Sequence, residues 1–321
     1  MTRLVGPARV GEAAQVLRSG GLVAFPTETV YGLGADAINA TAVEALFAAK
    51  GRPAGHPLIV HLPSADVVDR WAVDLDPRAR RLAEAFWPGP LTLVVPRTAD
   101  VPDVVTGGRA TVGLRVPNHP VALELLEAFG SGVAAPSANR FGHVSPTTPQ
   151  HVLRDLAGRI DLVVDGGPCS VGLESTIVEV VDGRVTLLRP GGLAVARIEE
   201  ALGEPVVDGR GGESRAPGML ESHYAPAATV EVLDLERLQD RIAELGSTSV
   251  AVLTPGKVDV PAGVFRWQLP PDADGFANRL YAALREADVL GVEHVVVVPP
   301  VDGPLADAIV DRLHKAASPR A

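Results

Sequence analysis

The amino-acid sequence predicts an α/β protein, with a twisted open α/β sheet domain followed by a smaller Rossmann-like βαβ domain. The length of 321 residues favours two domains, because domains usually contain about 100–200 residues. Apolar runs of strand length alternate with amphipathic segments of helical period along most of the chain. A stretch rich in Gly, Pro and charge, with neither period, precedes residue 229. We therefore predict domains over 1–205 and 229–321, joined by a linker over 206–228.

The elements of the first domain follow from periodicity and from turn residues. Thr41 and Glu44 have the spacing of a capping box, which predicts the start of a helix that ends at Lys50. Asp182-Gly183 predicts a tight hairpin turn between the last two strands. Further helices are predicted at 11–19, 76–86 and 119–129. Strands are predicted at 22–25, 58–62, 91–95, 112–116, 162–165, 176–181 and 184–188.

The second domain has a cleaner alternation of strand and helix. The predicted order is strand 229–235, helix 236–245, strand 249–253, helix 275–290, strand 294–298 and helix 304–317. Strands that alternate with helices in this way are typical of βαβ units, so we predict a mostly parallel sheet.

Composition excludes several classes of protein. The 29 basic and 39 acidic residues give a net charge of −10, which disfavours an extended surface for nucleic-acid phosphates. The single cysteine, Cys169, excludes an internal disulfide framework and a cysteine-based zinc cluster. We expect neither a signal peptide nor a membrane span, and therefore a cytoplasmic protein.

Lysine is rare in this chain. Lys50, Lys257 and Lys315 are the three lysines, and Lys50 is the one lysine in the first 256 residues. A compositional drift toward arginine explains most of this pattern. An ammonium retained at position 50 also indicates a role that a guanidinium does not fill.

Polar clusters occur where apolar strands end. The segment 26–34 combines hydroxyls, a carboxylate and glycines, and 50–53 places two cations after a helix. A Gly-rich turn and a basic helix C-terminus are the structural explanations of these two segments. His56 and His61 flank a proline and a predicted strand, which is poor geometry for a metal pair. We therefore expect no metal site held by protein alone, and common nucleotide and hydrolase motifs are absent.

Thr111 and Arg115 alternate along one strand, so their side chains share a face. An arginine on an apolar strand needs a carboxylate or phosphate partner. Further hydroxyls, an amide and cations occur in the segments 135–140, 145–147, 174–176 and 189–191. Each segment alone could be a cap or a turn. Together they favour the binding of a polyanion with a small polar molecule, and phosphate chemistry by charge stabilisation.

These segments form a series of motifs in a fixed order. They are PTETVYGLG, KGRP, PLIVH, WPGPLTLV, TVGLRVP, APSAN, SPT, ESTIV, LRPG and HYAP. In this order they resemble the L-threonylcarbamoyladenylate synthase family, which has the YrdC-like fold. The linker with its HYAP motif, and the second domain, resemble the long two-domain form. The resemblance is dense over residues 5–200 and looser beyond.

The resemblance implies an enzyme that joins L-threonine, bicarbonate and ATP into threonylcarbamoyl-AMP and pyrophosphate. A separate transferase complex then uses the product to modify an adenosine beside the tRNA anticodon. Lys50 and Arg52, with Mg²⁺, would neutralise the triphosphate. The labile product suggests that the linker with Tyr224 is a lid that closes over the nucleotide.

The resemblance also implies two sets of binding residues. Arg115 would hold the amino-acid carboxylate through its planar fork. His56 stands where the family often has Asn or Lys, so its contact would depend on pH. The threonine-binding residues would be Thr29, His61, Arg115, Ala135 and Ser175. The ATP-binding residues would be Arg52, His56, Thr111, Ser137, Asn139, Ser145, Arg189 and Tyr224.

Two other functions are compatible with parts of the pattern. A non-enzymatic RNA-binding module is disfavoured by the net charge and by the 4% of aromatic residues, because RNA readers need basic faces or stacking platforms. An ATP-dependent carbamoyl transferase that uses carbamoyl phosphate is the second alternative. No zinc-finger cysteines precede the motifs, which argues against the related hydrogenase-maturation enzymes.

Overall fold

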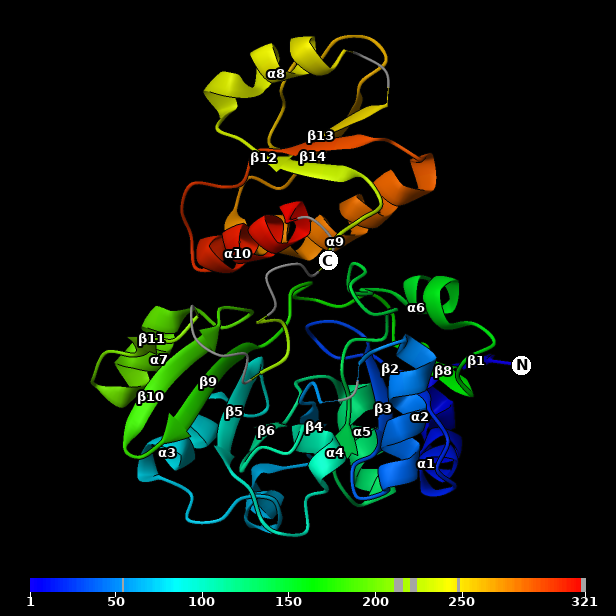
Figure 1. Ribbon diagram of the computed structural model, residues 1–321, viewed down its shortest axis with the longest axis vertical. Coiled ribbons are helices and arrows are strands. Elements are labelled where there is room, and N and C mark those ends of the chain that lie inside the picture. The colour runs from blue at the N-terminus through cyan, green and yellow to red at the C-terminus, as the bar shows by residue number, and fades with distance from the viewer. Residues whose placement is uncertain (54, 211–215, 220–223, 247–248, 319–321) are drawn as a thin grey trace. The chain divides into compact units, whose positions relative to one another are not determined.

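The computed structural model describes residues 1–53, 55–210, 216–219, 224–246 and 249–318. It divides into two compact units (Figure 1). Unit 1 consists of Met1–Phe141, Pro146–Ser170 and Glu174–Met219. Unit 2 consists of Gly142–Ser145, Val171–Leu173 and Leu220–Ala321.

This division differs from the predicted boundaries at 205 and 229. Unit 1 continues through the first part of the expected linker, because β11 (Val207–Asp208) pairs in parallel with β10 (Arg184–Arg189). Ala216, farther along, is buried in an apolar cluster of unit 1. Residues 211–215 and 220–223 of the expected linker lie outside the described residues.

The described part of unit 1 forms a mixed sheet of 11 strands, in the order β1-β8-β2-β3-β7-β4-β6-β5-β9-β10-β11. The strands not yet given are β1 (Arg3–Val5), β2 (Val23–Phe25), β3 (Gly32–Asp36), β4 (Ile59–His61), β5 (Leu91–Pro96), β6 (Thr111–Arg115), β7 (Val133–Ala134), β8 (Leu162–Val164) and β9 (Thr176–Val181). The α-helices of unit 1 are α1 (Val10–Arg18), α2 (Ala40–Lys50), α3 (Pro77–Phe86), α4 (Asp103–Thr106), α5 (Pro120–Phe129), α6 (Pro149–Leu156) and α7 (Val195–Leu202). Short 3-10 helices are η1 (Pro7–Arg9) and η2 (Ala65–Arg70).

Helix α2 begins two residues earlier than the capping-box spacing predicts. Asn39 is its N-cap, and the Asn39 side chain accepts a hydrogen bond from the Ala42 amide at 3.2 Å. The predicted cap at Thr41 is wrong because the Asn39 oxygen already satisfies an amide of the first turn. The helix ends at Lys50, and Gly51 follows with φ 63°, a conformation that glycine adopts without strain.

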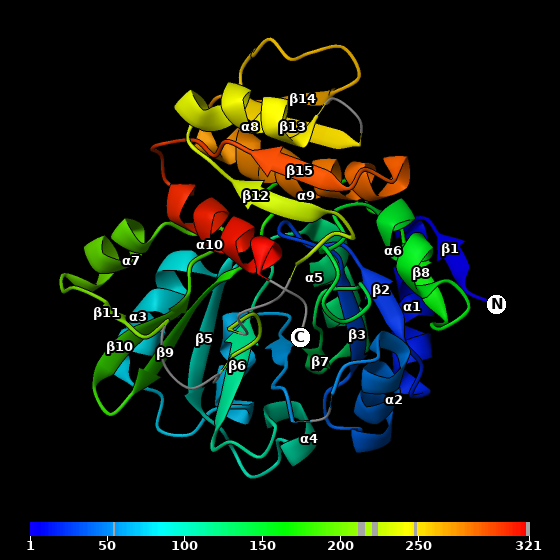
Figure 2. The same ribbon diagram turned by 45° about the horizontal axis from the view of Figure 1, so that its top comes forward.

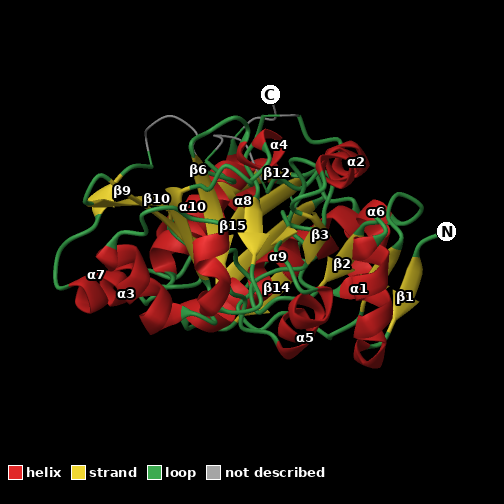
Figure 3. Cartoon of the chain, turned by 90° about the horizontal axis from the view of Figure 1, so that it is seen from below, coloured by secondary structure: helices red, strands yellow, loops and turns green. Residues whose placement is uncertain are grey.

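The two faces of the unit 1 sheet are covered differently. Alternate strand residues such as Val60, Leu93 and Leu114 belong to a large core with α2, α3, α6 and α7. On the opposite face, the strand residues that alternate with these, in β2, β7 and β8, pack against α1 and α5. Figure 3 shows α1 and α5 near β2. Over β4, β5, β9 and β10, the apolar cluster on that face is completed by the segment 216–219 instead of a helix, among the residues described. This part of the sheet is where polar side chains gather.

Unit 2 confirms the predicted parallel βαβ arrangement. Within its described residues, four parallel strands lie in the order β12 (Thr229–Val232), β15 (His294–Val297), β13 (Val250–Pro255) and β14 (Phe265–Leu269) (Figure 2). Strand β14 was not predicted. The helices are α8 (Leu238–Leu245), preceded by η3 (Leu235–Arg237), α9 (Ala273–Leu290) and α10 (Ala306–Ala317). In the described part of the chain, no helix combines the length and apolar character needed to cross a membrane.

The core position of Leu114 predicts a large loss of stability when its side chain is truncated. Leu114 is 0% exposed in the middle of β6, whereas Leu4 in β1 of the same sheet is 46% exposed. Leu114→Ala should reduce the free energy of unfolding by about 2–5 kcal/mol, because it removes contacts and leaves a cavity. Leu4→Ala should change it by no more than about 0.5 kcal/mol. Urea unfolding of both variants measures the difference, and equal effects would contradict this description of the core.

Candidate active site

Several predicted site residues lie on one face of neighbouring strands. His61 ends β4, and it is directly opposite Arg115 of β6 in the parallel pairing. Because side chains alternate along a strand, Thr111 shares the face of Arg115. Thr92 of β5 reaches the same region, and its hydroxyl lies 2.8 Å from the hydroxyl of Ser175, just before β9. The structure therefore brings His61, Thr111, Arg115 and Ser175 to one part of the sheet.

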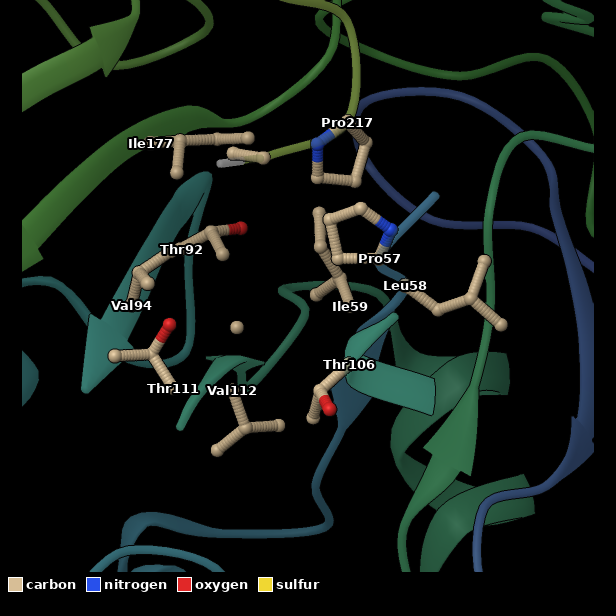
Figure 4. Close-up of a pocket in the computed structure, with 12 residues that line it drawn as sticks. Pro57, Leu58, Ile59, Thr92, Val94, Thr106, Thr111, Val112, Ile177 and Pro217 are labelled. Atoms are coloured by element: carbon tan, nitrogen blue, oxygen red, sulfur yellow. The ribbon is translucent and has the colours of Figure 1, made fainter. Parts of the chain in front are cut away.

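A pocket opens on this face of the sheet (Figure 4). Thr92, Thr106 and Thr111 supply hydroxyls around it, and Ile59 and Pro217 supply apolar walls. Gly113, between Thr111 and Arg115, also lines the pocket. A Cβ atom at Gly113 would lie 3.5 Å from both Ile59 and Thr92. A larger side chain there would therefore occupy space that the glycine leaves open.

The partner that Arg115 needs on its apolar strand is Glu28. The Arg115 Nη2 lies 2.8 Å from Glu28 Oε1, and the side chains of Arg115 and Glu28 are 4% and 6% exposed. The Arg115 Nε donates to the Gly89 carbonyl at 3.2 Å. Such a buried pair tolerates the loss of water only because each charge has its partner. Glu28 belongs to the polar segment 26–34, but it was not among the predicted site residues.

His61 lies in an environment that favours its neutral form. Burial, and then the positive charge of Arg115, lower the pKa of His61 to about 3. The imidazole also meets the ring of Phe25 edge-on, with ring centres 6.0 Å apart. At neutral pH this histidine is therefore an uncharged polar group beside Arg115.

Arg189 contacts Ser175 and the segment that completes the apolar cluster. Its Nε and Nη2 donate to the Ser175 carbonyl at 3.2 and 2.8 Å, and Nη1 donates to the Pro217 carbonyl at 3.0 Å. Gly191, just after β10, lets its backbone approach the segment just before β9, because a Cβ atom there would lie 2.2 Å from the Glu174 carbonyl oxygen. Arg189, predicted to bind ATP, thus also fixes the backbone of a predicted threonine ligand.

The predicted catalytic lysine lies at the end of α2. Lys50 is 2% exposed, and its Nζ donates to the carbonyls of Ser137, at 2.6 Å, and Asn139. The same loop bonds β4 through the Ala135 amide, which donates to the Ile59 carbonyl at 2.9 Å. The loop over 135–139 therefore joins the strand of His61 to the ammonium of Lys50.

Arg52 and His56 lie near the end of that loop. The Arg52 guanidinium is 5.8 Å from the centre of the Phe141 ring, and the His56 ring centre is 5.7 Å from it. Arg52 also donates to the Pro57 carbonyl at 3.1 Å. Burial, followed by the charges of Arg52 and Arg109, lowers the pKa of His56. An approaching anion would oppose the effect of these charges, which supports the expectation that contacts of His56 depend on pH.

The remaining predicted residues are divided between the units. Thr29 is buried in unit 1, and its hydroxyl lies 2.8 Å from that of Thr27. Ser145 and Tyr224 belong to unit 2, where both are buried. Tyr224 stacks on Tyr281 of α9, so its described surroundings are those of unit 2. His223 of the same motif lies outside the described residues.

The described residues provide no cluster of three or more His, Cys, Asp or Glu side chains that could hold a metal ion. A magnesium ion that entered with a nucleotide would take its main ligands from phosphate oxygens.

The lowered pKa of His61 predicts a pH dependence of stability. Between its ordinary value of 6.5 and about 3, the unfolded chain binds a proton at residue 61 that the folded chain excludes. The free energy of unfolding must then fall as the pH is lowered through this window. From pH 7.5 to 5.5 the wild-type protein should lose about 1.4 kcal/mol more than His61→Asn. Urea unfolding at both pH values tests this, and equal losses would show that His61 is protonated in the folded state.

Comparison with known proteins finds two family models, which match successive parts of the chain. The Sua5/YciO/YrdC family model, described as "Telomere recombination", matches residues 15–191. The model described as "Threonylcarbamoyl-AMP synthase, C-terminal domain" matches residues 193–318.

Relatives match this chain over nearly its whole length. Threonylcarbamoyl-AMP synthase of Pyrococcus abyssi is 41% identical, and the match covers 96% of this chain and 94% of the relative. The Bacillus subtilis protein of the same name is also 41% identical, with 97% and 94% covered. A structure of P. abyssi Sua5 complexed with L-threonine superimposes with a TM-score of 0.92 at 39% identity, and covers 98% of each chain. The chain therefore belongs to the threonylcarbamoyl-AMP synthase family, in its two-domain form.

Proposed function

We propose that this protein synthesises L-threonylcarbamoyl-AMP and pyrophosphate from L-threonine, bicarbonate and ATP. The observation that carries the proposal is the loop over 135–139. It bonds β4, the strand of His61, at one end and receives the ammonium of Lys50 at the other. The region of His61 and Arg115, suited to a small polar molecule, is thereby joined to Lys50 and Arg52, two cations suited to a triphosphate.

The proposed reaction has two steps. The threonine amine and bicarbonate form a carbamate and water. A carbamate oxygen then attacks the α-phosphorus of ATP, and the bond to the β-phosphate breaks as pyrophosphate leaves. The carbamate is already an anion, so the second step needs no protein nucleophile. The difficulty is to bring two anions together, which buried cations and orientation address.

The side chains of unit 1 have separate roles in this scheme. Arg115 orients the threonine carboxylate, and Glu28 holds its guanidinium from the other side. Neutral His61 supplies a polar contact without adding a second positive charge beside Arg115. Lys50 and Arg52 would stabilise negative charge on the phosphates, and we propose that Mg²⁺ enters as the metal–ATP complex.

The product would pass to a tRNA threonylcarbamoyl transferase complex, as the first step of tRNA threonylcarbamoyladenosine modification. We place the reaction in the cytoplasm. The acidic net charge of −10 is consistent with a protein that hands on a small product and does not itself bind tRNA.

Incubation with ATP, L-threonine and labelled bicarbonate tests the proposed function. We expect pyrophosphate and an adenylate that carries the label, and formation of both should require all three substrates. A parallel reaction replaces bicarbonate with carbamoyl phosphate. If carbamoyl phosphate alone supports the reaction, the protein is a carbamoyl transferase and the proposal is wrong.

Removing the Lys50 ammonium should impair chemistry with the fold intact. Lys50→Ala should reduce the rate of pyrophosphate release about 100-fold or more, as the loss of a charge-stabilising donor does in other enzymes. Lys257→Ala removes an exposed lysine of unit 2 and should leave the rate unchanged. The rate of pyrophosphate release and the thermal unfolding temperature are measured for both. Wild-type turnover in Lys50→Ala would remove Lys50 from the mechanism.

Arg115 should act mainly on threonine binding. Arg115→Ala should raise the KM for threonine about 10-fold or more, because a charge-assisted hydrogen bond is worth about 1.5–3 kcal/mol. The KM for ATP should change much less. Arg184→Ala removes an exposed arginine from a strand of the same sheet and serves as the control. An unchanged threonine KM in Arg115→Ala would contradict the assignment.

A further inference from the structure

Unit 2 contains two short segments from the part of the chain that otherwise belongs to unit 1. They are Gly142–Ser145 and Val171–Leu173, which group with residues 220–321. The first ends on Ser145, a predicted ATP ligand. The second immediately precedes the Glu174-Ser175 motif of unit 1. Contacts within unit 2 therefore hold the backbone of Ser145 and of the residues just before Glu174-Ser175.

One face of α9 makes these contacts. Asn278, Tyr281 and Arg285 are spaced by three and four residues, which places them on one side of an α-helix. We call these three residues the α9 face. Each member contacts a different segment of unit 2.

Arg285 holds the backbone around Ser145. Arg285 is buried, with 5% of its surface exposed. Nε donates to the Ser145 carbonyl at 3.3 Å, and Nη2 donates to the carbonyl of Val144. Two donors from one planar group to successive carbonyls restrict the backbone rotation of that segment. Ser145 itself is completely buried in unit 2.

Tyr281 holds the second predicted ATP ligand of unit 2. Its ring stacks on that of Tyr224, with centres 5.8 Å apart and planes at 24°. The guanidinium of Arg312 from α10 lies 5.1 Å from the centre of the Tyr224 ring. Tyr224 has φ 63°, a backbone conformation that costs a non-glycine residue energy and requires support from its surroundings.

Asn278 lies where the segment Val171–Leu173 meets the helix. Gly172 has φ 84°, and a Cβ atom there would lie 2.6 Å from the Asn278 Cα. A glycine is therefore required both for the backbone conformation and for the close approach to α9. Leu173, the next residue, is completely buried.

We infer that the α9 face sets the positions of Ser145 and Tyr224 for the nucleotide, with Arg285 as the principal positioning residue. This inference rests on the proposed function, because ATP is the ligand that the family resemblance assigns to both residues. It gives unit 2 a part in the reaction. Arg285 does not touch the substrate in this account; it acts through the backbone of Val144 and Ser145.

The test compares Arg285→Ala with Arg279→Ala on the same helix. Arg279 is about half exposed, and its guanidinium lies 3.8 Å from Glu286, so its loss removes an equal charge without touching the loop. We expect the KM for ATP to rise about 10-fold in Arg285→Ala, the loss expected for a charge-assisted contact. Arg279→Ala should behave as wild type. Hydrogen exchange should become faster in a peptide that covers residues 142–148 of Arg285→Ala.

Arg285→Lys separates positioning from simple packing. A lysine keeps the charge but has no planar fork, so its KM for ATP should lie between those of wild type and Arg285→Ala. The affinity for threonine without ATP, measured by calorimetry, should stay within twofold of wild type in all variants. If Arg285→Ala fails to fold, Arg285→Lys and its hydrogen exchange decide the matter.

The outcomes distinguish this inference from the proposed function. If wild-type protein neither binds nor consumes ATP, the proposed function is wrong. If wild type uses ATP, and both Arg285→Ala and Arg285→Lys match Arg279→Ala in the KM for ATP and in exchange, the inference is wrong. A parallel loss of ATP and threonine affinity would show a general structural role and would also overturn it.

Discussion

The ion pair between Glu28 and Arg115 is the interaction on which the candidate active site depends. A guanidinium that is 4% exposed on an apolar strand is costly unless a counter-charge lies beside it. Glu28 supplies that charge from the loop after β2, and so fixes the loop against β6. The pair also adds no net charge to this part of the sheet, which would suit a zwitterionic ligand. With neutral His61 alongside, the region proposed to bind the amino acid is polar but nearly balanced in charge, and the proposed phosphate contacts are left to Lys50 and Arg52.

The second constraint is the unequal covering of the sheet. Helices cover one face of unit 1 throughout, whereas the opposite face has helices at the β8-β2 end only, among the residues described. Over β4, β5 and β6 the strands direct Ile59, Thr92 and Thr111 into the space that remains, and Arg115 lies buried on the same face. Gly113 keeps that space open, and Gly191 lets the backbone of Glu174 and Ser175 approach closely. The site is therefore a consequence of where helix packing stops.

Local patterns in the sequence predicted most of the elements, because strand and helix periods are local properties. The hairpin at Asp182-Gly183 is confirmed, with φ 51° and 71° at the two residues. Strand β3 was hidden in a Gly-rich segment, where Gly34 lets Val133 and Phe25 approach closely. The Glu28 pairing could not be located, although the need of Arg115 for a counter-charge was evident. The grouping of Ser145 with unit 2 could not be predicted either. This grouping and the Glu28 pairing both depend on contacts between residues distant in the chain.

A crystal structure with L-threonine and a non-hydrolysable ATP analogue tests the central claim most directly. The account predicts threonine density beside His61 and Ser175, with its carboxylate against Arg115. It also predicts that the α-phosphate lies on the side of Lys50. The phosphate should be close enough to the threonine nitrogen for an oxygen of a carbamate formed there to attack it. Threonine bound elsewhere, or a nucleotide far from it on another surface, would contradict the assignment of this face as the active site.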